Sequence, residues 1–468
     1  MTVPRTRRRP AGLAVLLACL LAVAGYFAVG GTRQYLANRN YHPIPVPAAS
    51  PPAADVGHAL STAAPAAVPT AVAAPEPTPA GVAAALAEPL AAADLGPSVS
   101  AQVLDAVTGD TLFSRRADAL VAPASTSKLA TAAAVLTVHR PTDRFGTRVV
   151  AGADPHTVVL VGGGDPTLSA APSGQAPAYP EAGRISDLAA KVRTALGGTP
   201  VTQVLVDDSL FTGPATAPGW APEDSPSSYA CPITAAMVDG GRDTPDATIR
   251  SAAPDLAAGN ALARALGGAQ VALGSAPSGA RVLGTVQSAP VGVLVEQMLR
   301  DSDNVLAEVL GRQVALSAHQ PASFAGAAAA VRSTVTGLGI PAGDGMRDAS
   351  GLSVLDRMPA DALSQVLVHA ESGNDKQLWP ILSGLSVAGW DGSLVEQGRF
   401  TGPAAAADGA VRAKTGSLTG VSAMVGVLTD ADGRQLIFAF VADRAPSEGP
   451  TRVAIDDLAA ALVGCGCR

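Results

Sequence analysis

The stretch Ser125-Thr126-Ser127-Lys128 opens a predicted helix, rich in Ala and Leu, that extends to Val138. Side chains at positions i and i+3 share one face of a helix, so the Lys128 amine can approach the Ser125 hydroxyl. A serine hydroxyl is a weak nucleophile without a nearby base, and a desolvated lysine can act as that base. The spacing also fits a helix-capping serine followed by a surface lysine, so this motif alone leaves both interpretations open.

Strand patterns flank this helix at both ends of the folded region. Val99, Ala101 and Val103 alternate with polar residues, and a turn at Gly109 leads to a returning strand. Further strands, followed by a last helix, are expected in three C-terminal ranges: 411–418, 421–429 and 435–441. The helix is expected from about 452 to 463. These patterns predict one five-stranded antiparallel sheet covered by helices from the middle of the chain, an α+β architecture.

A second polar motif, Ser302-Asp303-Asn304, lies between two stretches with helical periodicity. At such a junction the Ser302 hydroxyl could relay a proton, and the Asn304 amide could hold a peptide group of a substrate. Ser, Asp and Asn are also the preferred helix caps, so for this motif taken alone capping is the better explanation.

The third motif is Lys414-Thr415-Gly416-Ser417, on a predicted strand. Gly416 would let a ligand lie against the strand edge. The other three side chains offer a cation and two hydroxyls to a carboxylate. The backbone N–H groups of Ser125 and Ser417 could form an oxyanion hole. A hairpin turn with a solvated lysine is the alternative.

The three motifs occur together and in a fixed order, and two of the only four lysines of the chain lie in them. In this respect the chain resembles the penicillin-recognising serine enzymes, whose signatures are S-x-x-K, S-x-N and K-T-G. The resemblance implies a transpeptidase/β-lactamase-like fold. Coincidence is a poor explanation for all three motifs.

More than 170 residues separate Lys128 from Ser302, so an inserted domain is expected there. This insertion resembles that of the D-alanyl-D-alanine carboxypeptidase/endopeptidase branch, the penicillin-binding protein 4 type or S13 serine peptidases. Further matching stretches are 162–166, 206–211, 303–308 and 348–353, whereas 229–237 matches loosely. The expected domains are a catalytic domain formed by 93–145 and 288–468, and an inserted domain at 146–287.

The resemblance implies a serine D,D-peptidase that hydrolyses the D-alanyl-D-alanine bond of peptidoglycan stem peptides and also binds β-lactams. Ser125 would attack the peptide carbonyl, Lys128 would take its proton, and Ser302 would relay a proton to the leaving amine. Asn304 would bind the side amide of the substrate. The terminal carboxylate would be received by Lys414, Thr415 and Ser417. Neither a cofactor nor a metal is implied.

Two other functions remain open. A β-lactamase could use Glu371 and Asn374, which have the Glu-x-x-Asn spacing of some deacylating enzymes. The apolar periodicity before Glu371 and the glycine at 373 favour a helix end instead. A non-catalytic wall-binding scaffold with the same fold is the other alternative, although it would have no physical need for three intact motifs.

The N-terminus predicts export. Residues 1–10 carry four arginines and form a basic cytoplasmic tip, and residues 11–30 are uncharged and mostly apolar. We expect a signal-anchor there, with a cleaved signal peptide as the alternative, so the protein would be extracytoplasmic and either membrane-anchored or secreted. Residues 31–92, rich in Ala and Pro, are expected to form a linker. The net charge of −7 argues against a nucleic-acid partner.

The four cysteines are Cys19, Cys231, Cys465 and Cys467, and none has metal-binding spacing. In an exported protein Cys231 could pair with Cys465 or Cys467. Free thiols are equally compatible with the sequence, because spacing alone does not fix the distance between their Cα atoms.

Overall fold

The structure is a computed structural model that describes residues 74–372 and 376–468. The predicted cytoplasmic tip, the predicted anchor at 11–30 and Asn374 lie outside the described residues. Within the described part of the chain, every helix is too short or too polar to cross a membrane.

The main sheet is antiparallel and has the strand order β10-β11-β12-β13-β1-β2. Its strands are β1 (Ser98–Asp105), β2 (Thr111–Arg115), β10 (Ser386–Val387), β11 (Val411–Leu418), β12 (Val421–Thr429) and β13 (Gln435–Asp443). The five predicted strands are present, and the first and last parts of the chain meet where β1 pairs with β13. The predicted count is wrong by one, because the two-residue β10 adds a sixth, edge strand.

Strand β1 is buried along its whole length, although Ser98, Ser100 and Gln102 alternate in it with apolar residues. It lies between β13 and β2, and its polar side chains have partners: Ser100 Oγ donates to the carbonyl of Arg116 at 2.9 Å, and Gln102 Nε2 donates to Asp361 Oδ1 at 3.0 Å. The alternation therefore separates two buried faces rather than one buried and one solvated face.

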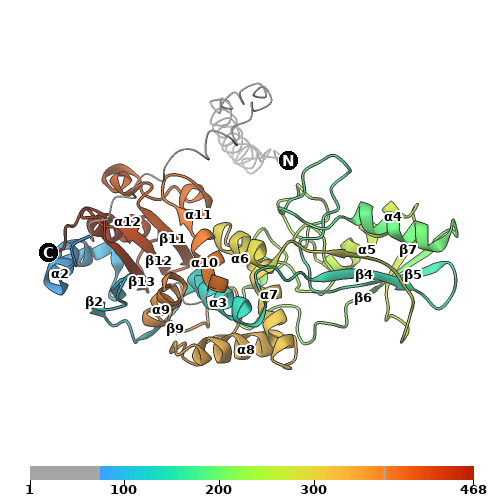
Figure 1. The fold of residues 1–468 in the computed structure, drawn as a ribbon, viewed down its shortest axis with the longest axis horizontal. Coiled ribbons are helices and arrows are strands. Elements are labelled where there is room, and N and C mark those ends of the chain that lie inside the picture. The colour runs from blue at the N-terminus through green and yellow to red at the C-terminus, as the bar shows by residue number, and fades with distance from the viewer. Residues whose placement is uncertain (1–73, 373–375) are drawn as a thin grey trace, which may run out of the picture. The chain divides into compact units, whose positions relative to one another are not determined.

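Helices cover both faces of this sheet (Figure 1). Helix α12 (Glu448–Val463) and helix α2 (Pro79–Ala87) share one apolar core with it, and α9 (Ala360–Glu371) packs on the other face. The predicted linker from 31 to 92 is thus wrong at its C-terminal end. Val82 and Leu86, spaced four residues apart on α2, are completely buried, so this segment belongs to the folded core.

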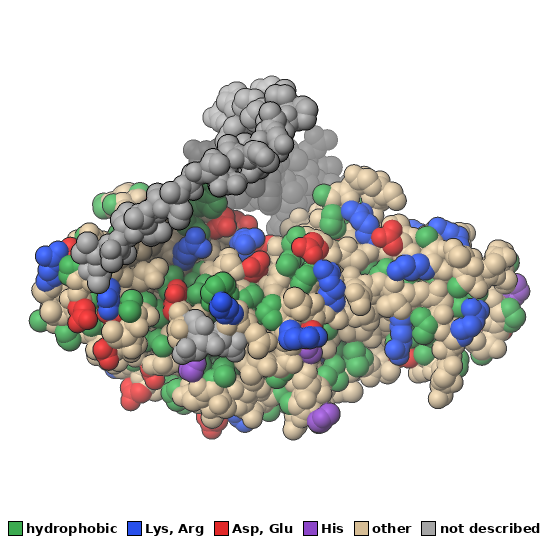
Figure 2. All heavy atoms as spheres, viewed as in Figure 1, with side chains coloured by type: hydrophobic (Ala, Val, Ile, Leu, Met, Phe, Trp, Pro, Cys, Tyr) green, Lys and Arg blue, Asp and Glu red, His purple; other side chains and the backbone are tan. Residues whose placement is uncertain are grey.

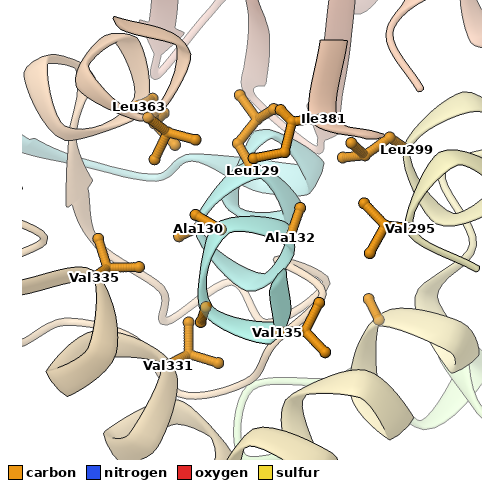
Figure 3. Close-up of a cluster of buried hydrophobic side chains, with 14 of the residues drawn as sticks. Leu129, Ala130, Ala132, Val135, Val295, Leu299, Val331, Val335, Leu363 and Ile381 are labelled. Carbon is orange, nitrogen blue, oxygen red and sulfur yellow. The ribbon is translucent and has the colours of Figure 1, made fainter. Parts of the chain in front are cut away.

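The helix that begins at Lys128 is the centre of the second core. Helix α3 (Lys128–Val138) contacts α6 (Val291–Arg300), α7 (Asn304–Ser317), α8 (Phe324–Gly337) and α9. Figure 3 shows its side chains directed outward on several sides, toward Val295 and Leu299, Val331 and Val335, Leu363, and Ile381 of α10 (Trp379–Ser383). Its small alanines allow this close approach, so the position of Lys128 is fixed by packing on several sides.

Residues between α3 and α6 form a second, mixed sheet with the order β7-β6-β5-β4-β8. Its elements are β4 (Gly146–Ala151), β5 (Thr157–Val161), β6 (Gln203–Asp207), β7 (Gln270–Leu273), β8 (Val282–Gln287) and the helices α4 (Ile185–Leu196) and α5 (Pro254–Ala265), which share an apolar core with the strands. Lys and Arg side chains lie scattered over the visible face of this part in Figure 2. The remaining short elements are β3 (Leu120–Val121), β9 (Met358–Pro359) and α11 (Gly392–Glu396).

The cysteines match neither of the two alternatives in full. Cys465 forms a disulfide with Cys467, and Cys231 is a buried free thiol. Cys231 lies in a separate apolar cluster with Phe211 and Phe324, away from the C-terminal tail, which packs against α2. A bond from Cys231 to either C-terminal cysteine is therefore not formed.

Candidate active site

Ser125 lies on a tight turn, Ala124–Ser127, that leads directly into α3. Ala124 has a φ of +48°, in the left-handed region that few non-glycine residues adopt. Two glycines make room for this turn. A Cβ on Gly416 would lie 2.9 Å from the carbonyl oxygen of Pro123, and a Cβ on Gly351 would collide with the carbonyl oxygen of Ala124. Gly416 thus allows close packing of β11 against the Ser125 turn, a role that its sequence context did not suggest.

Lys128 is fully buried, and its Nζ has three oxygen neighbours. They are Ser125 Oγ at 2.9 Å, Asn304 Oδ1 at 2.6 Å and the carbonyl oxygen of Ser350 at 2.7 Å. Amide and peptide carbonyl oxygens can only accept hydrogen bonds. A neutral amine would therefore give its two hydrogens to Asn304 and Ser350, and its lone pair would face the Ser125 hydroxyl.

The electrostatics around Lys128 agree with a titratable amine. Burial lowers the pKa of Lys128 from 10.5 to about 8, and the carboxylates of Asp348, Glu308, Asp303 and Asp356 oppose part of this shift. A pKa in this range lets the side chain lose its proton near neutral pH.

The loop that follows α8 carries the carbonyl that faces Lys128. Asp348 accepts hydrogen bonds from the backbone N–H groups of Ser350, Gly351 and Ser353, and from the Trp220 indole at 2.8 Å. These bonds fix the loop and so hold the Ser350 carbonyl in place. The sequence identified 348–353 as a matching stretch but assigned no role to it, because nothing local reveals which carbonyl reaches the lysine.

Ser302 lies between α6 and α7 with a φ of +56°, and Asn304 is the first residue of α7. Asp303 caps that helix through the Leu306 N–H at 3.0 Å. Both interpretations of this motif are therefore compatible: Asp303 is the cap, while Ser302 and Asn304 face the cleft. Asn304 Nδ2 also donates to the carbonyl of Tyr229 at 3.3 Å, which fixes the amide with its oxygen toward Lys128.

Asp303 is held by side chains from the segment between β5 and β8, which the sequence did not indicate. Tyr179 donates its hydroxyl to Asp303 Oδ2 at 2.6 Å, and Arg250 forms a buried ion pair with the same oxygen at 3.2 Å. Burial alone would raise the pKa of Asp303, but Arg250 and the Tyr179 hydrogen bond lower it to about 2. Asp303 is therefore an anion, and its bonds to Tyr179 and Arg250 anchor the backbone between Ser302 and Asn304.

Lys414 does not face the open cleft. It is fully buried, and its Nζ donates to Ser302 Oγ at 2.9 Å and to the carbonyl of Thr415 at 2.8 Å. Burial and the nearby charge of Lys128 lower its pKa well below the usual value. This position differs from the sequence-based expectation that Lys414 receives a substrate carboxylate.

Thr415 and Ser417 of the same strand do face the cleft. Thr415 Oγ1 lies 2.8 Å from Ser393 Oγ, and Ser417 Oγ accepts from Arg452 Nη2 at 3.2 Å. The outer edge of β11 pairs with β10 only at 412 and 413, so β10 leaves the edge from 414 onward free.

These groups line one cleft of about 890 Å³. Its lining includes most of the predicted site residues: Ser125, Ser302, Asn304, Thr415 and Ser417. Tyr229 and Arg242 line it from the inserted segment, and Glu448 and Arg452 from α12. Among the described residues, no group of three His, Cys, Asp or Glu is arranged to hold a metal ion.

Glu371, the residue that would support a β-lactamase, is the last residue of α9 and is absent from the described lining of the cleft. Its position agrees with the predicted helix end.

A serine beside a buried lysine at a helix start, facing a Lys-Thr-Gly strand, is the arrangement of the penicillin-recognising serine enzymes. The chain matches the D-Ala-D-Ala carboxypeptidase 3 (S13) family over residues 82–248 and 243–462. It belongs to this family and is therefore a serine peptidase of the carboxypeptidase type.

The relatives agree with this assignment. The chain is 46% identical to a carboxypeptidase of Mycobacterium tuberculosis over 396 residues, which is 82% of this chain and 84% of the relative. It is 43% identical to the carboxypeptidase DacB of Mycolicibacterium smegmatis over 464 residues, which covers 97% and 96% of the two chains. Its fold is similar to that of penicillin binding protein 4 from Haemophilus influenzae, with a TM-score of 0.64 at 20% identity, covering 78% of this chain and 96% of that one.

Proposed function

We propose that the chain hydrolyses the D-alanyl-D-alanine bond of peptidoglycan stem peptides through an acyl enzyme on Ser125. One observation carries this proposal. Lys128 Nζ lies 2.9 Å from Ser125 Oγ, while two carbonyl oxygens occupy its other hydrogen-bonding directions. A neutral Lys128 in this position gives its two hydrogens to these carbonyl oxygens, so its lone pair is directed at the serine hydroxyl and can accept its proton.

Acylation begins when Ser125 Oγ attacks the carbonyl carbon of the penultimate D-alanine and its proton passes to Lys128. The negative charge that develops on the carbonyl oxygen would be stabilised by the backbone N–H groups of Ser125 and Ser417. The close packing of β11 against the Ser125 turn at Gly416 supports this pairing, because it brings the two backbones together.

The leaving amine needs a proton when its C–N bond breaks. Ser302 faces the cleft and is held there by Lys414, so Ser302 would relay to the amine the proton that Lys128 took from Ser125, which leaves Lys128 neutral again. Lys414 thus acts behind Ser302. Free D-alanine departs, and water then hydrolyses the ester on Ser125 with Lys128 as the base.

The substrate peptide would lie along the free edge of β11 from 414 onward, in the manner of an added strand. Asn304 would bind its side amide. The hydroxyls of Thr415 and Ser417 would receive its terminal carboxylate. A cross-linked stem peptide presents the same bond type, so endopeptidase action is included in the proposal.

The same site would be acylated by β-lactams, which offer Ser125 a strained amide. A β-lactam complex is known for penicillin binding protein 4 of H. influenzae, whose fold is similar at a TM-score of 0.58. Peptidoglycan lies outside the cytoplasm, so the enzyme would act there, attached to the membrane through residues 11–30 or secreted.

The test uses the purified full-length chain and two muropeptides, a pentapeptide that ends in D-Ala-D-Ala and a cross-linked dimer. We expect the pentapeptide to lose one terminal alanine, measured by mass. Ser125→Ala should release none, whereas Ser372→Ala, an exposed serine outside the cleft lining, should match the wild type. Labelling of Ser125 by penicillin without any peptide cleavage would instead favour the non-catalytic scaffold.

A further inference from the structure

Arg452, on the first turns of α12, is a cation in direct contact with one of the cleft hydroxyls proposed to bind the carboxylate. Its Nη2 donates to Ser417 Oγ at 3.2 Å, and both residues line the cleft that contains Ser125. Lys414, the cation that the sequence suggested for this task, is buried behind Ser302. Arg242 and Arg250 also line the cleft, from the inserted segment, but Arg452 is the arginine that is bonded to Ser417.

Several contacts hold Arg452 in position. The backbone carbonyl of Arg452 accepts from Arg399 Nη2 at 3.4 Å, and Arg399 forms a buried ion pair with Asp456 at 2.7 Å, one turn further along α12. Thr451 Oγ1 donates to the carbonyl of Asp94 at 2.6 Å. A guanidinium on such a fixed backbone is preorganised for a planar anion.

The guanidinium of Arg452 also has a hydrogen-bond donor that the described residues leave without an acceptor. Its Nε is buried and has no acceptor within residues 74–372 and 376–468. Its Nη2 is shared between Ser417 Oγ and the carboxylate of Glu448, four residues earlier on the same helix. The Glu448 side chain is 61% exposed, so its ion pair with Arg452 is solvated and weak enough to be exchanged for another carboxylate.

We propose that Arg452 is the specificity residue that binds the free C-terminal carboxylate of the substrate, together with Thr415 and Ser417, and that Glu448 occupies Arg452 until the substrate arrives. The proposal rests on the proposed peptidase function and adds to it. An arginine beside two hydroxyls can bind a carboxylate with charge-assisted hydrogen bonds. Glu448 would then be a competing anion that the substrate displaces.

The test compares two substrates that differ only at the carboxylate, an N-acyl-D-Ala-D-Ala and its C-terminal carboxamide. For the wild type, kcat/KM is expected to be higher for the acid. Arg452→Gln should lower kcat/KM about 10- to 100-fold for the acid, since a charge-assisted hydrogen bond is lost. For the carboxamide it should change kcat/KM less than about threefold. A structural role of Arg452 would lower both values equally.

Three further variants sharpen this comparison. Arg452→Lys should keep part of the preference for the acid, because the charge remains but the fork geometry is lost. Glu448→Gln should raise kcat/KM for the acid about two- to threefold, because a weak competing ion pair is removed. Arg140→Gln removes a surface ion pair with Asp143 outside the cleft and should change neither value.

Equal losses on both substrates in Arg452→Gln, or a loss on neither, would overturn the proposal. If Arg452→Gln does not fold, Arg452→Lys and Glu448→Gln decide the question, and an unchanged preference for the acid in both would overturn it. Failure of the proposed function looks different, because the wild type would then cleave neither substrate and penicillin would not acylate Ser125.

Discussion

The site contains two serine–lysine pairs, one at the start of α3 and one between β11 and the α6–α7 junction. In each pair the lysine is fully buried and lies 2.9 Å from a serine hydroxyl. Their surroundings differ. Lys128 is near four acidic side chains, whereas Lys414 is near one, Asp301, and is repelled by Lys128.

Because the charges around the two lysines differ, each lysine is suited to a different task. Burial lowers both pKa values, but the carboxylates keep the pKa of Lys128 at about 8, where a base can both take and return a proton near neutral pH. At Lys414 burial lowers the pKa well below the usual value, the charge of Lys128 lowers it as well, and only Asp301 opposes this shift. Lys128 is therefore suited to activate Ser125, and Lys414 to orient Ser302.

The largest difference between the pairs should appear on removing each amine. Lys128→Ala should reduce the rate of acylation by penicillin about 10³- to 10⁴-fold, because the amine that takes the proton of Ser125 is lost. Lys414→Ala should reduce it only about 10²-fold, because Ser302 remains. Stopped-flow or intact-mass measurement of acylation gives both rates. Equal losses would mean that the two lysines share one task.

The pH dependence tests the state of Lys128. Since the amine must be unprotonated to act, kcat/KM should rise as the pH rises through about 8. Asp348→Asn removes a negative charge that raises the pKa of Lys128, so this rise should move to lower pH. Glu308, Asp303 and Asp356 also face Lys128 and remain in the variant. A rise that stays in place or moves to higher pH would contradict this role of Asp348.

Gly416 connects the two pairs, because it lets β11 pack on the Ser125 turn. Gly416→Ala would place a methyl group 2.9 Å from the carbonyl oxygen of Pro123. Overpacking of this kind costs about 1–3 kcal/mol. We expect a lower melting temperature and roughly tenfold slower acylation, because the Ser125 turn must shift. Gly337→Ala, at the end of α8 outside the cleft lining and with nothing near the added methyl group, is the control. Slower acylation in this variant would contradict the role assigned to β11 packing.

The smallest effect is expected at Glu371, which belongs to neither pair. Glu371→Gln should leave penicillin hydrolysis and peptide cleavage within about twofold of the wild type, because this carboxylate ends α9 outside the cleft lining and a surface substitution changes little. A selective loss of penicillin turnover would restore the β-lactamase hypothesis.

The sequence predicted the motifs and the main sheet well because both leave local signals. Strand alternation and the three motifs, each of three or four residues, can be recognised within a few positions of the sequence. Strand β10 was missed because two residues show no periodicity. Helix α12 begins at Glu448 rather than near Arg452, since Pro450 lies in its first turn, where proline is tolerated.

The environment of each motif could not be predicted, because it depends on contacts distant in sequence. Lys128 meets Asn304 across 176 positions, and Tyr179 meets Asp303 across 124. Burial of Lys414 behind Ser302 and the approach of Arg452 to Ser417 likewise follow from packing between separate elements. The motif residues were thus predictable, and their partners were not.

The most direct test of the central claim locates the acyl group. The full-length chain is treated with benzylpenicillin, digested with trypsin, and the peptide 117–128 is sequenced by tandem mass spectrometry. We predict that the penicilloyl mass lies on Ser125 and is absent from Ser125→Ala. A penicilloyl group on Ser127 or on another peptide, or an adduct that persists in Ser125→Ala, would contradict the account.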